Sequence, residues 1–335
     1  MEKMITKAEL DECAQYINSC REELSKRVIG QKEVVDGIIT ALIAGGHVLL
    51  EGVPGLAKTL AVRTFAEISG LDFKRIQFTP DVLPADVTGT LIYEQSTGKF
   101  TVRKGPVFSN VVLADEINRA PAKVQSALLE AMAENSVTIG ETTYKLPSPF
   151  FVLATQNPIE QEGTYNLPEA ELDRFLLKLI VNYPSLEEEF AIVKTEGKAS
   201  EIPVKKVFNE HAFEKCRQTV EAITVDEKIL SYIVSLVSVT RPDFDRKADR
   251  RSATTKNDIQ RYISFGASPR AGIALLKCAK VVALFSGRSF VFPEDVKSVA
   301  KQVLRHRLVL NYEAAADQVT ADDIIEKILD LMPVP

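Results

Sequence analysis

The chain has 335 residues, enough for two domains of ordinary size, and its 45% hydrophobic and 26% charged residues are typical of a globular protein with a substantial core. Its formal net charge of −5 argues against a protein whose whole surface attracts nucleic acid or an anionic membrane. The four cysteines form no C-x-x-C pair and no metal-binding spacing with the three histidines, which favours a cytoplasmic location, and Cys13 and Cys20 are expected to be buried thiols on the apolar stripe of a helix. We expect no transmembrane segment, because the best candidate, 271–285, is too short and carries two lysines.

The first half of the chain alternates short apolar runs with helical patterns. The runs are 47–50, 75–78, 111–114, 150–154 and 176–181. They are almost continuously apolar, as in strands of a parallel sheet that helices cover on both faces. Two further segments, 88–108 and 137–146, carry the pattern of β-hairpins around a glycine-containing turn. The sequence therefore predicts an α/β fold with two hairpin insertions.

The strand signal fades after Pro184, and only helical patterns follow. These are 186–195, 210–223, 226–240, 269–286, 293–307 and 321–331. We therefore predict one domain over residues 1–184 and a helical domain over residues 185–335. The polar stretch 241–261 has mixed charges, which favours a solvated loop over a dedicated binding site.

The segment between the first apolar run and the first helical pattern predicts a phosphate-binding loop. Loop N–H groups and the helix N-terminus would hold the β-phosphate, Lys58 would reach the β- and γ-oxygens, and the Thr59 hydroxyl would bind Mg²⁺. The pattern G-x-x-x-x-G-K-[ST] has glycine where this chain has Ala57, which is tolerable if that position has helical dihedrals. The alternative is an ordinary Gly-Pro turn before a helix. The residues expected at the nucleotide are Gly52, Val53, Pro54, Gly55, Leu56, Ala57, Lys58, Thr59 and Leu60.

Two adjacent carboxylates, Asp115 and Glu116, follow the apolar run 111–114. Carboxylates at the end of a buried strand are costly without partners, and a phosphate-binding loop supplies them. Asp115 is expected to hold Mg²⁺ through water with the help of Thr59, and Glu116 to take a proton from the attacking water. The alternative interpretation is a helix N-cap.

Three more polar residues are candidates for the same reaction. Asn157 follows the run 150–154 and could orient the lytic water, although an Asn-Pro turn is the simpler alternative. Arg174 and Arg270 could each bind the charge that develops on the γ-phosphate. The alternative for each arginine is a surface ion pair worth ~0–1 kcal/mol.

The motifs at 52–59, 113–119, 154–158, 167–175 and 266–271 resemble, in this order, those of the AAA+ ATPases and, within them, the MoxR family. The resemblance covers nearly the whole chain, and alanine at position 57 is similar to that family's usual variant. It implies a P-loop NTPase (AAA+) fold, a three-layer sandwich with a parallel sheet followed by an all-α lid domain, with ATP and Mg²⁺ as cofactors.

The resemblance also implies roles for individual segments. Asn157 matches sensor 1, Arg174 matches the arginine finger that enters the next subunit's site, and Arg270 matches sensor 2. The hairpin segments match the helix-2 insert and the hairpin before sensor 1. The residues expected to pack against adenine are Val28, Ile29 and Gly30.

At the level of the assembly, the resemblance implies a homo-oligomeric ring, a hexamer, with ATP or ADP at the subunit interfaces. It also implies a protein client and a partner with a von Willebrand factor A domain. The stretch 241–265 is longer than the family leads us to expect, which leaves open whether Arg270 serves its own site or a neighbour's.

The sequence as a whole predicts an ATP hydrolase that remodels a protein partner. Two alternatives stay open: a DNA-associated motor, against which the net charge argues weakly, and a nucleotide-gated binding module that scarcely turns over. A GTPase is disfavoured because the chain has no Asn-Lys-x-Asp signature.

Overall fold

The computed structural model of the chain describes residues 5–53, 56, 58–158, 163–242 and 260–335. Packing divides the chain into two compact units, Gln15–Glu214 and Met1–Ala14 with Lys215–Pro335. The expected boundary between residues 184 and 185 concerns the end of the nucleotide-binding core and stays a prediction.

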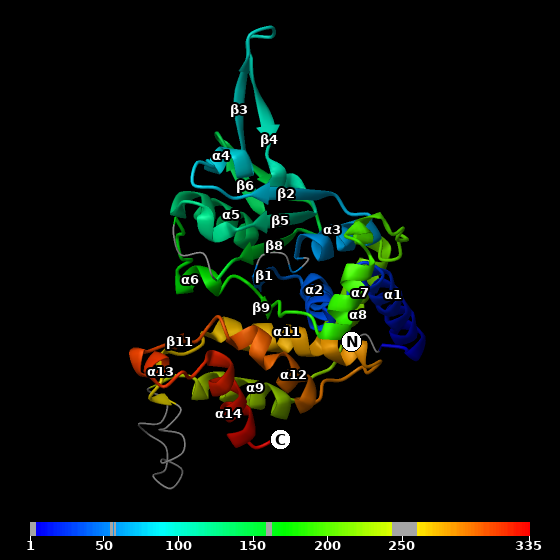
Figure 1. Ribbon diagram of the computed structural model, residues 1–335, viewed down its shortest axis with the longest axis vertical. Helices are drawn as coiled ribbons and strands as arrows, with labels where there is room; N and C mark the ends of the chain where they lie inside the picture. Colours follow the sequence, from blue (N-terminus) through cyan, green and yellow to red (C-terminus); the bar gives the residue numbers. More distant parts are fainter. Residues whose placement is uncertain (1–4, 54–55, 57, 159–162, 243–259) are drawn as a thin grey trace. The chain divides into compact units, whose positions relative to one another are not determined.

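The first unit is built on a five-stranded parallel sheet (Figure 1). Its strands, in spatial order, are β2 (Phe73–Gln77), β5 (Val111–Asp115), β8 (Phe151–Gln156), β1 (Val48–Glu51) and β9 (Leu177–Ile180). Every neighbouring pair is parallel. The five apolar runs of the sequence are therefore the five strands, and the predicted parallel sheet is confirmed.

Helices cover both faces of this sheet. Alternate strand residues, among them Leu49, Val112 and Val152, share one buried core with the inner face of α5 (Ala122–Glu134). The opposite face includes Phe151, whose ring packs edge-on against Phe65 of α3 (Lys58–Ser69), with centroids 6.4 Å apart. The helix α2 (Lys32–Ala44) is buried over most of its length and packs against β9. Coverage of both faces explains the continuous apolar runs of the inner strands, whereas the edge strand β2 is buried only at Ile76 and carries polar residues beside it.

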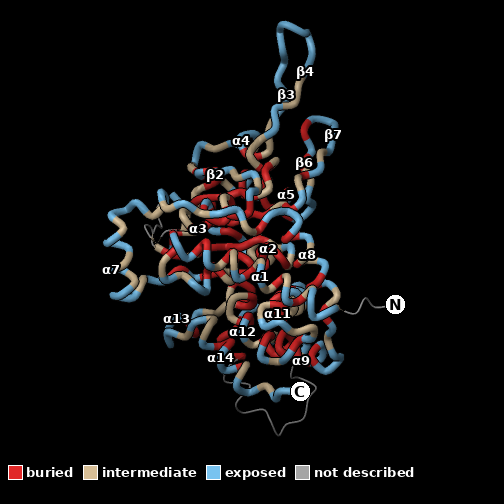
Figure 2. Tube along the Cα trace, turned by 90° about the vertical axis from the view of Figure 1, so that its right-hand side faces the viewer, coloured by how far each residue is buried: buried red, intermediate tan, exposed pale blue. Residues whose placement is uncertain are grey.

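Both predicted hairpins are present. The first is β3 (Gly89–Glu94) with β4 (Lys99–Lys104), which follows the short helix α4 (Pro84–Thr88). The second is β6 (Ser136–Ile139) with β7 (Thr142–Lys145). The two hairpins lie side by side (Figure 2), and a Cβ on Gly140 would fall 2.7 Å from Cδ1 of Leu91.

Short helices complete this unit. They are η1 (Pro106–Phe108), η2 (Ile117–Arg119), α6 (Glu169–Leu172), α7 (Leu186–Lys194) and η3 (Lys198–Glu201). Two longer helices, α1 (Lys7–Ser25) and α8 (Glu210–Glu221), run across the division between the units. The apolar stripe of α1 is buried, and all four cysteines of the chain are buried and unbridged.

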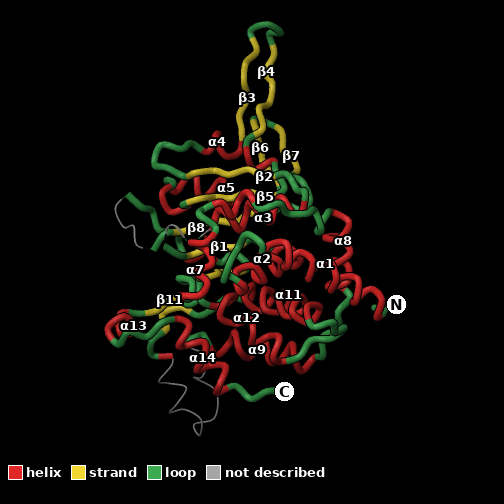
Figure 3. Tube along the Cα trace, turned by 45° about the vertical axis from the view of Figure 1, so that its right-hand side comes forward, coloured by secondary structure: helices red, strands yellow, loops and turns green. Residues whose placement is uncertain are grey.

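The second unit is mainly helical (Figure 3). Its helices are α9 (Glu227–Val239), α11 (Pro269–Phe285), α12 (Pro293–Leu304), α13 (Tyr312–Ala316) and α14 (Ala321–Leu331). A small antiparallel pair, β10 (Ile263–Phe265) with β11 (Val309–Leu310), was not predicted, because two and three residues are too few to show a period. Most of the polar stretch 241–261 lies outside the described residues.

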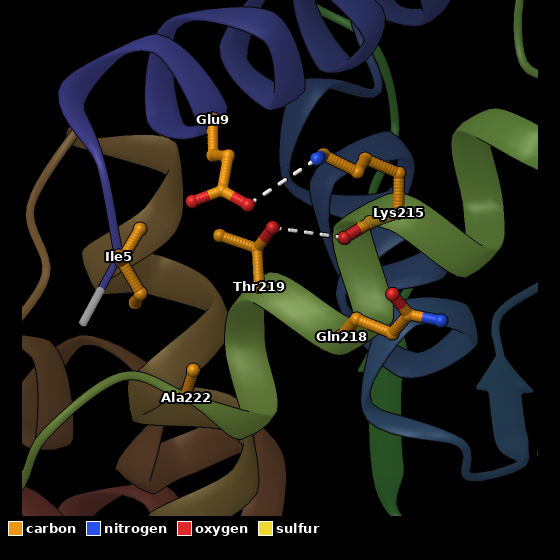
Figure 4. Close-up of a pocket in the computed structure, with 6 residues that line it drawn as sticks. All are labelled: Ile5, Glu9, Lys215, Gln218, Thr219 and Ala222. Carbon is orange, nitrogen blue, oxygen red and sulfur yellow. Dashed lines mark hydrogen bonds and ion pairs between the residues drawn. The ribbon is translucent and has the colours of Figure 1, made fainter. Parts of the chain in front are cut away.

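The N-terminal residues of the second unit are tied to α8 by polar contacts (Figure 4). Nζ of Lys215 lies 3.4 Å from Oε1 of Glu9, and the Thr219 hydroxyl donates to the Lys215 carbonyl at 2.9 Å. Within the parts of the chain that the structure describes, no helix is both long enough and apolar enough to cross a membrane.

Candidate functional site

The predicted phosphate-binding loop joins β1 to α3, at the carboxyl end of the sheet. Lys58 is the first residue of α3, and its Nζ donates to the carbonyl of Gly52 at 2.6 Å. Burial lowers the pKa of Lys58, while the carboxylates of Asp115 and Glu116 act in the opposite direction. The lysine and the acid pair therefore share one electrostatic environment. Thr59 and Leu60 continue α3, whereas Pro54, Gly55 and Ala57 lie outside the described residues.

Asp115 is the last residue of β5 and is buried between two donors. The hydroxyl of Thr155, on β8, donates to its Oδ1 at 2.6 Å. Nε and Nη2 of Arg75, on β2, donate to its Oδ2 at 3.0 and 2.6 Å. Both carboxylate oxygens are thus held by side chains from the two neighbouring strands, which offsets the cost of burying the charge.

Glu116 turns the chain out of β5 with a left-handed backbone, φ 58° and ψ 50°. This conformation is strained for a residue with a Cβ, and strain of this kind gathers at functional sites. The Glu116 N–H donates to the Thr155 hydroxyl at 2.8 Å, and its Oε2 accepts from Nε2 of Gln77 at 2.9 Å. Nε of Arg119 lies 3.2 Å from the same Oε2. The side chain does not cap η2, which argues against the N-cap alternative.

Asn157 directly follows β8 and is buried. Its carbonyl accepts from Nδ2 of Asn118 at 3.5 Å, so the segments after β5 and β8 lie together, as expected for neighbouring parallel strands. The Oδ1 of Asn118 is buried and has no hydrogen-bond partner among the described residues. A buried acceptor without a donor is unusual and marks this edge of the sheet as a place where a ligand or water would be bound.

The segment predicted to pack against adenine lies between α1 and α2. Val28 is buried, and Gly30 has a φ of +76°, which favours glycine. A Cβ on Gly30 would also collide with the Glu188 carboxyl group, and Nε2 of Gln31 donates to the Asn182 carbonyl at 3.1 Å. The residues that follow β9 therefore lie against this segment.

The same stretch after β9 also meets the start of the phosphate-binding loop. A Cβ on Gly52 would fall 2.8 Å from the carbonyl oxygen of Val181. Glycine at position 52 is thus explained by a close approach of backbone. The two segments predicted to bind nucleotide, 28–30 and 52–60, border the same stretch of chain, residues 181–188, which joins β9 to the first turn of α7.

The structure places the two candidate arginines in different units. Arg174 is exposed after α6, and its Nη1 donates to the Leu129 carbonyl at 3.0 Å. Arg270 is exposed in the first turn of α11, where Ser268 caps the helix by accepting from the Arg270 N–H at 3.1 Å. Among the contacts that the described residues make within the first unit, none joins Arg174 to Lys58 or to the acid pair. The catalytic roles of Arg174 and Arg270 stay predictions.

The donor set suits Mg²⁺. The described residues hold no group of three or more His, Cys, Asp or Glu that could cage a metal ion. Mg²⁺ is usually held by one or two carboxylates together with substrate phosphates and water, and it prefers hard oxygen ligands. Asp115 and the Thr59 hydroxyl are such ligands, and would bind the ion in the presence of a nucleotide.

Sequence reasoning missed the residues that hold the acid pair. Arg75 and Gln77 lie on an edge strand forty residues upstream, and only the parallel register of β2 with β5 brings them to Asp115 and Glu116. Thr155 lies within the motif 154–158, but nothing in the sequence marks its hydroxyl as a hydrogen-bond partner of the acid pair. Polar residues at alternate positions of β2 are the one available clue.

Comparisons with known proteins agree with this geometry. Residues 47–177 match the family described as "ATPase family associated with various cellular activities (AAA)", and residues 255–328 match the AAA lid domain. The chain is 46% identical to Chaperone MoxR1 of Mycobacterium tuberculosis, covering 93% of this chain and 81% of that protein. It is 31% identical to Protein MoxR of Methylorubrum extorquens, covering 93% of each.

A solved structure gives the same result. The crystal structure of a putative ATPase from Cytophaga hutchinsonii superposes with a TM-score of 0.86 at 46% identity and covers 98% of each chain. The predicted fold, a P-loop core with a parallel sheet followed by a helical lid domain, is confirmed. With both domains matched and two MoxR proteins covered over most of their length, the chain belongs to the MoxR family of AAA ATPases.

Proposed function

We propose that the protein hydrolyses ATP with Mg²⁺ and uses the turnover to remodel protein complexes, as a chaperone-like ATPase. The observation that carries the proposal is the geometry at the carboxyl end of the sheet, where Lys58 begins α3 after β1, and where Asp115 ends β5 and Glu116 follows it, with Thr155 hydrogen-bonded to both. A lysine at a helix N-terminus, with one carboxylate to hold Mg²⁺ and a second to act as base at the end of another strand, is the recurring set of groups in P-loop phosphoryl transfer.

Each side chain has a defined task in this proposal. Lys58 binds the β- and γ-phosphate oxygens in place of the Gly52 carbonyl that it contacts. Mg²⁺, when bound, neutralises the charge that develops on the phosphates. Glu116 takes the proton of the attacking water, and its Oε2 is oriented for this by Gln77 and Arg119.

The remaining candidates complete the site. Asn157 orients the water or contacts the γ-phosphate from the end of β8. The segment 28–30, which is Val28, Ile29 and Gly30, packs against the adenine base. Arg174 stabilises the transition state in a neighbouring copy, which agrees with its exposure and with a hydrogen bond that leaves most of the guanidinium donors available. Loss of the γ-phosphate would then alter contacts between copies, and this change would do the work.

The assembly and the client are further parts of the proposal. We infer a homo-oligomeric ring, a hexamer, from the membership of the AAA family, and a finger that acts on a neighbour requires at least a second copy of the chain. The name of the relative Chaperone MoxR1 supports a protein client, and a partner with a von Willebrand factor A domain is part of the same inference. The four unbridged cysteines agree with a cytoplasmic site of action. A DNA-associated motor is not favoured at a net charge of −5.

The test is Glu116→Gln, with Glu130→Gln on the exposed face of α5 as the matched control. The first variant should still bind ATP while phosphate release falls by roughly 10²–10⁴, the contribution of a general base. The control should hydrolyse ATP like the parent protein. Unchanged turnover in Glu116→Gln would reject this glutamate as the base.

Two measurements on the parent protein address the rest. Specific activity should rise with protein concentration as copies assemble, and a constant low value would favour the nucleotide-gated binding module. DNA that stimulates hydrolysis in a salt-sensitive manner would favour the motor. The Glu116→Gln protein, kept in the presence of ATP, can also serve as bait in a pull-down that identifies the client.

A further inference from the structure

Arg75 lies on the edge strand of the sheet and has no role assigned by the motifs. β2 leaves most of its side chains accessible, and within this strand only Ile76 is buried. Arg75 nevertheless reaches β5, where its Nε and Nη2 lie 3.0 and 2.6 Å from Oδ2 of Asp115. Both donors act on one carboxylate oxygen, which makes this a short, charge-assisted contact.

The other oxygen of Asp115 is engaged from inside the sheet. Its Oδ1 accepts from the hydroxyl of Thr155 at 2.6 Å, and Thr155 is almost fully buried. Oδ2 is therefore the oxygen that Asp115 can offer to a cation and its water shell. Arg75 uses the lone pairs of that same atom.

Asp115 also acts on a second cation at longer range. Burial lowers the pKa of Lys58 overall, and the charge of Asp115 opposes this effect, so Lys58 lies within the electrostatic field of the carboxylate that Arg75 contacts. A divalent ion brought to Oδ2 would be repelled by both Lys58 and Arg75. Lys58 is half-buried and needed at the phosphates, whereas the Arg75 side chain is 49% exposed. Arg75 is therefore the side chain that can move away from Oδ2 of Asp115.

Gln77 offers Arg75 a hydrogen-bond partner when Arg75 leaves Asp115. Nη2 of Arg75 also donates to Oε1 of Gln77 at 2.6 Å, on the same strand and toward solvent. We propose that Arg75 competes with Mg²⁺ for Oδ2 of Asp115 and so sets the Mg²⁺ concentration at which this protein binds nucleotide; the inference rests on the proposed function. Arg75 is a positioning residue in this scheme, since it acts through Asp115 and does not touch the nucleotide.

The test measures binding, not turnover. The affinity of the parent protein for N-methylanthraniloyl-ADP is measured over a series of Mg²⁺ concentrations and in EDTA. In Arg75→Gln, half-maximal tightening should need about twofold to fivefold less Mg²⁺, the factor that corresponds to a partly exposed ion pair. The affinity in EDTA should be unchanged. Lys74→Gln is the matched control, because it removes the same charge from the adjacent, exposed position of β2.

A second variant separates charge from geometry. Arg75→Lys keeps the charge and loses the fork, so its Mg²⁺ requirement should lie between those of the parent and Arg75→Gln. An unchanged or increased Mg²⁺ requirement in Arg75→Gln, or an equal decrease in Lys74→Gln, would overturn the inference and leave the proposed function standing. If the parent protein failed to bind the fluorescent ADP at every Mg²⁺ concentration tested, both the inference and the proposed function would be overturned.

Discussion

Thr155 links the two acids, and its removal gives the sharpest test of how the site is held. The hydroxyl donates to Oδ1 of Asp115 and accepts the N–H of Glu116. In Thr155→Val the shape is nearly kept, but a charge-assisted hydrogen bond worth about 1.5–3 kcal/mol is lost. The N–H of Glu116 is also left without its acceptor, at a cost of about 1–3 kcal/mol. Because the two effects overlap, we expect a loss of about 2–5 kcal/mol in the free energy of unfolding.

The chain supplies a matched control in α3. Thr64 is fully buried like Thr155, but its Oγ1 has no hydrogen-bond partner within the described part of the chain. The free energies of unfolding of both variants are measured by urea titration. Thr64→Val should leave this free energy unchanged or raise it slightly. Hydrogen exchange at the Glu116 amide should accelerate in Thr155→Val alone, and ATP turnover should fall with it. Equal stabilities for the two variants would refute the assignment of Thr155 as the link between the acids.

Two further predictions concern pH and backbone conformation. Burial lowers the pKa of His47 to about 4, against a raising effect of its hydrogen bond with the Met132 carbonyl, so the folded state keeps this histidine neutral. The unfolded chain binds the proton below about pH 6.5. The contribution of His47 to the free energy of unfolding should therefore be constant above that pH and fall by about 3 kcal/mol between pH 6.5 and 4. Urea titrations over this range should show a correspondingly smaller fall in His47→Asn than in the parent protein. Gly30→Ala should weaken the binding of fluorescent ADP, because the Cβ must displace the Glu188 carboxyl group from its hydrogen bond with the Ser185 N–H, in addition to the strain of a positive φ. Gly197→Ala, where φ is +74° and no atom lies within 4 Å of the Cβ, carries the strain alone and should bind ADP normally, so equal losses in the two variants would contradict the explanation.

The local sequence pattern predicted the helices and strands of this fold well, but it did not predict which strands pair over long distances in the chain. The run 111–114 became β5 because both faces of the strand are covered, and the hairpin turn at Gly98 followed from a glycine with positive φ. The spatial order β2-β5-β8-β1-β9 and the pairing of β10 with β11 depend on segments far apart in the chain. Periodicity carries no information on which strands become neighbours, so the contact between Arg75 and Asp115 could not be predicted.

The ends of elements were predicted less accurately where tertiary contacts end them. The pattern for α12 extends to residue 307, but the helix stops at Leu304, and His306 and Arg307 are buried beyond it. The left-handed conformation of Glu116 is another case. Nothing local favours it, and the hydrogen bond of its N–H to Thr155 on the neighbouring strand holds it in place.

The position of the candidate site follows from the order of the strands. From β1 the chain crosses to the far edge at β2, returns through β5 and β8, and then passes β1 to form β9. In open parallel sheets, ligands bind at the carboxyl ends of the strands where this order reverses, because the connections there diverge. Lys58 follows β1 at that point, and Asp115 lies two strands away, held by neighbours on both sides. A nucleotide at this reversal therefore depends on all five strands, including an edge strand and the stretch 181–188 after β9, neither of which a nucleotide-binding motif marks.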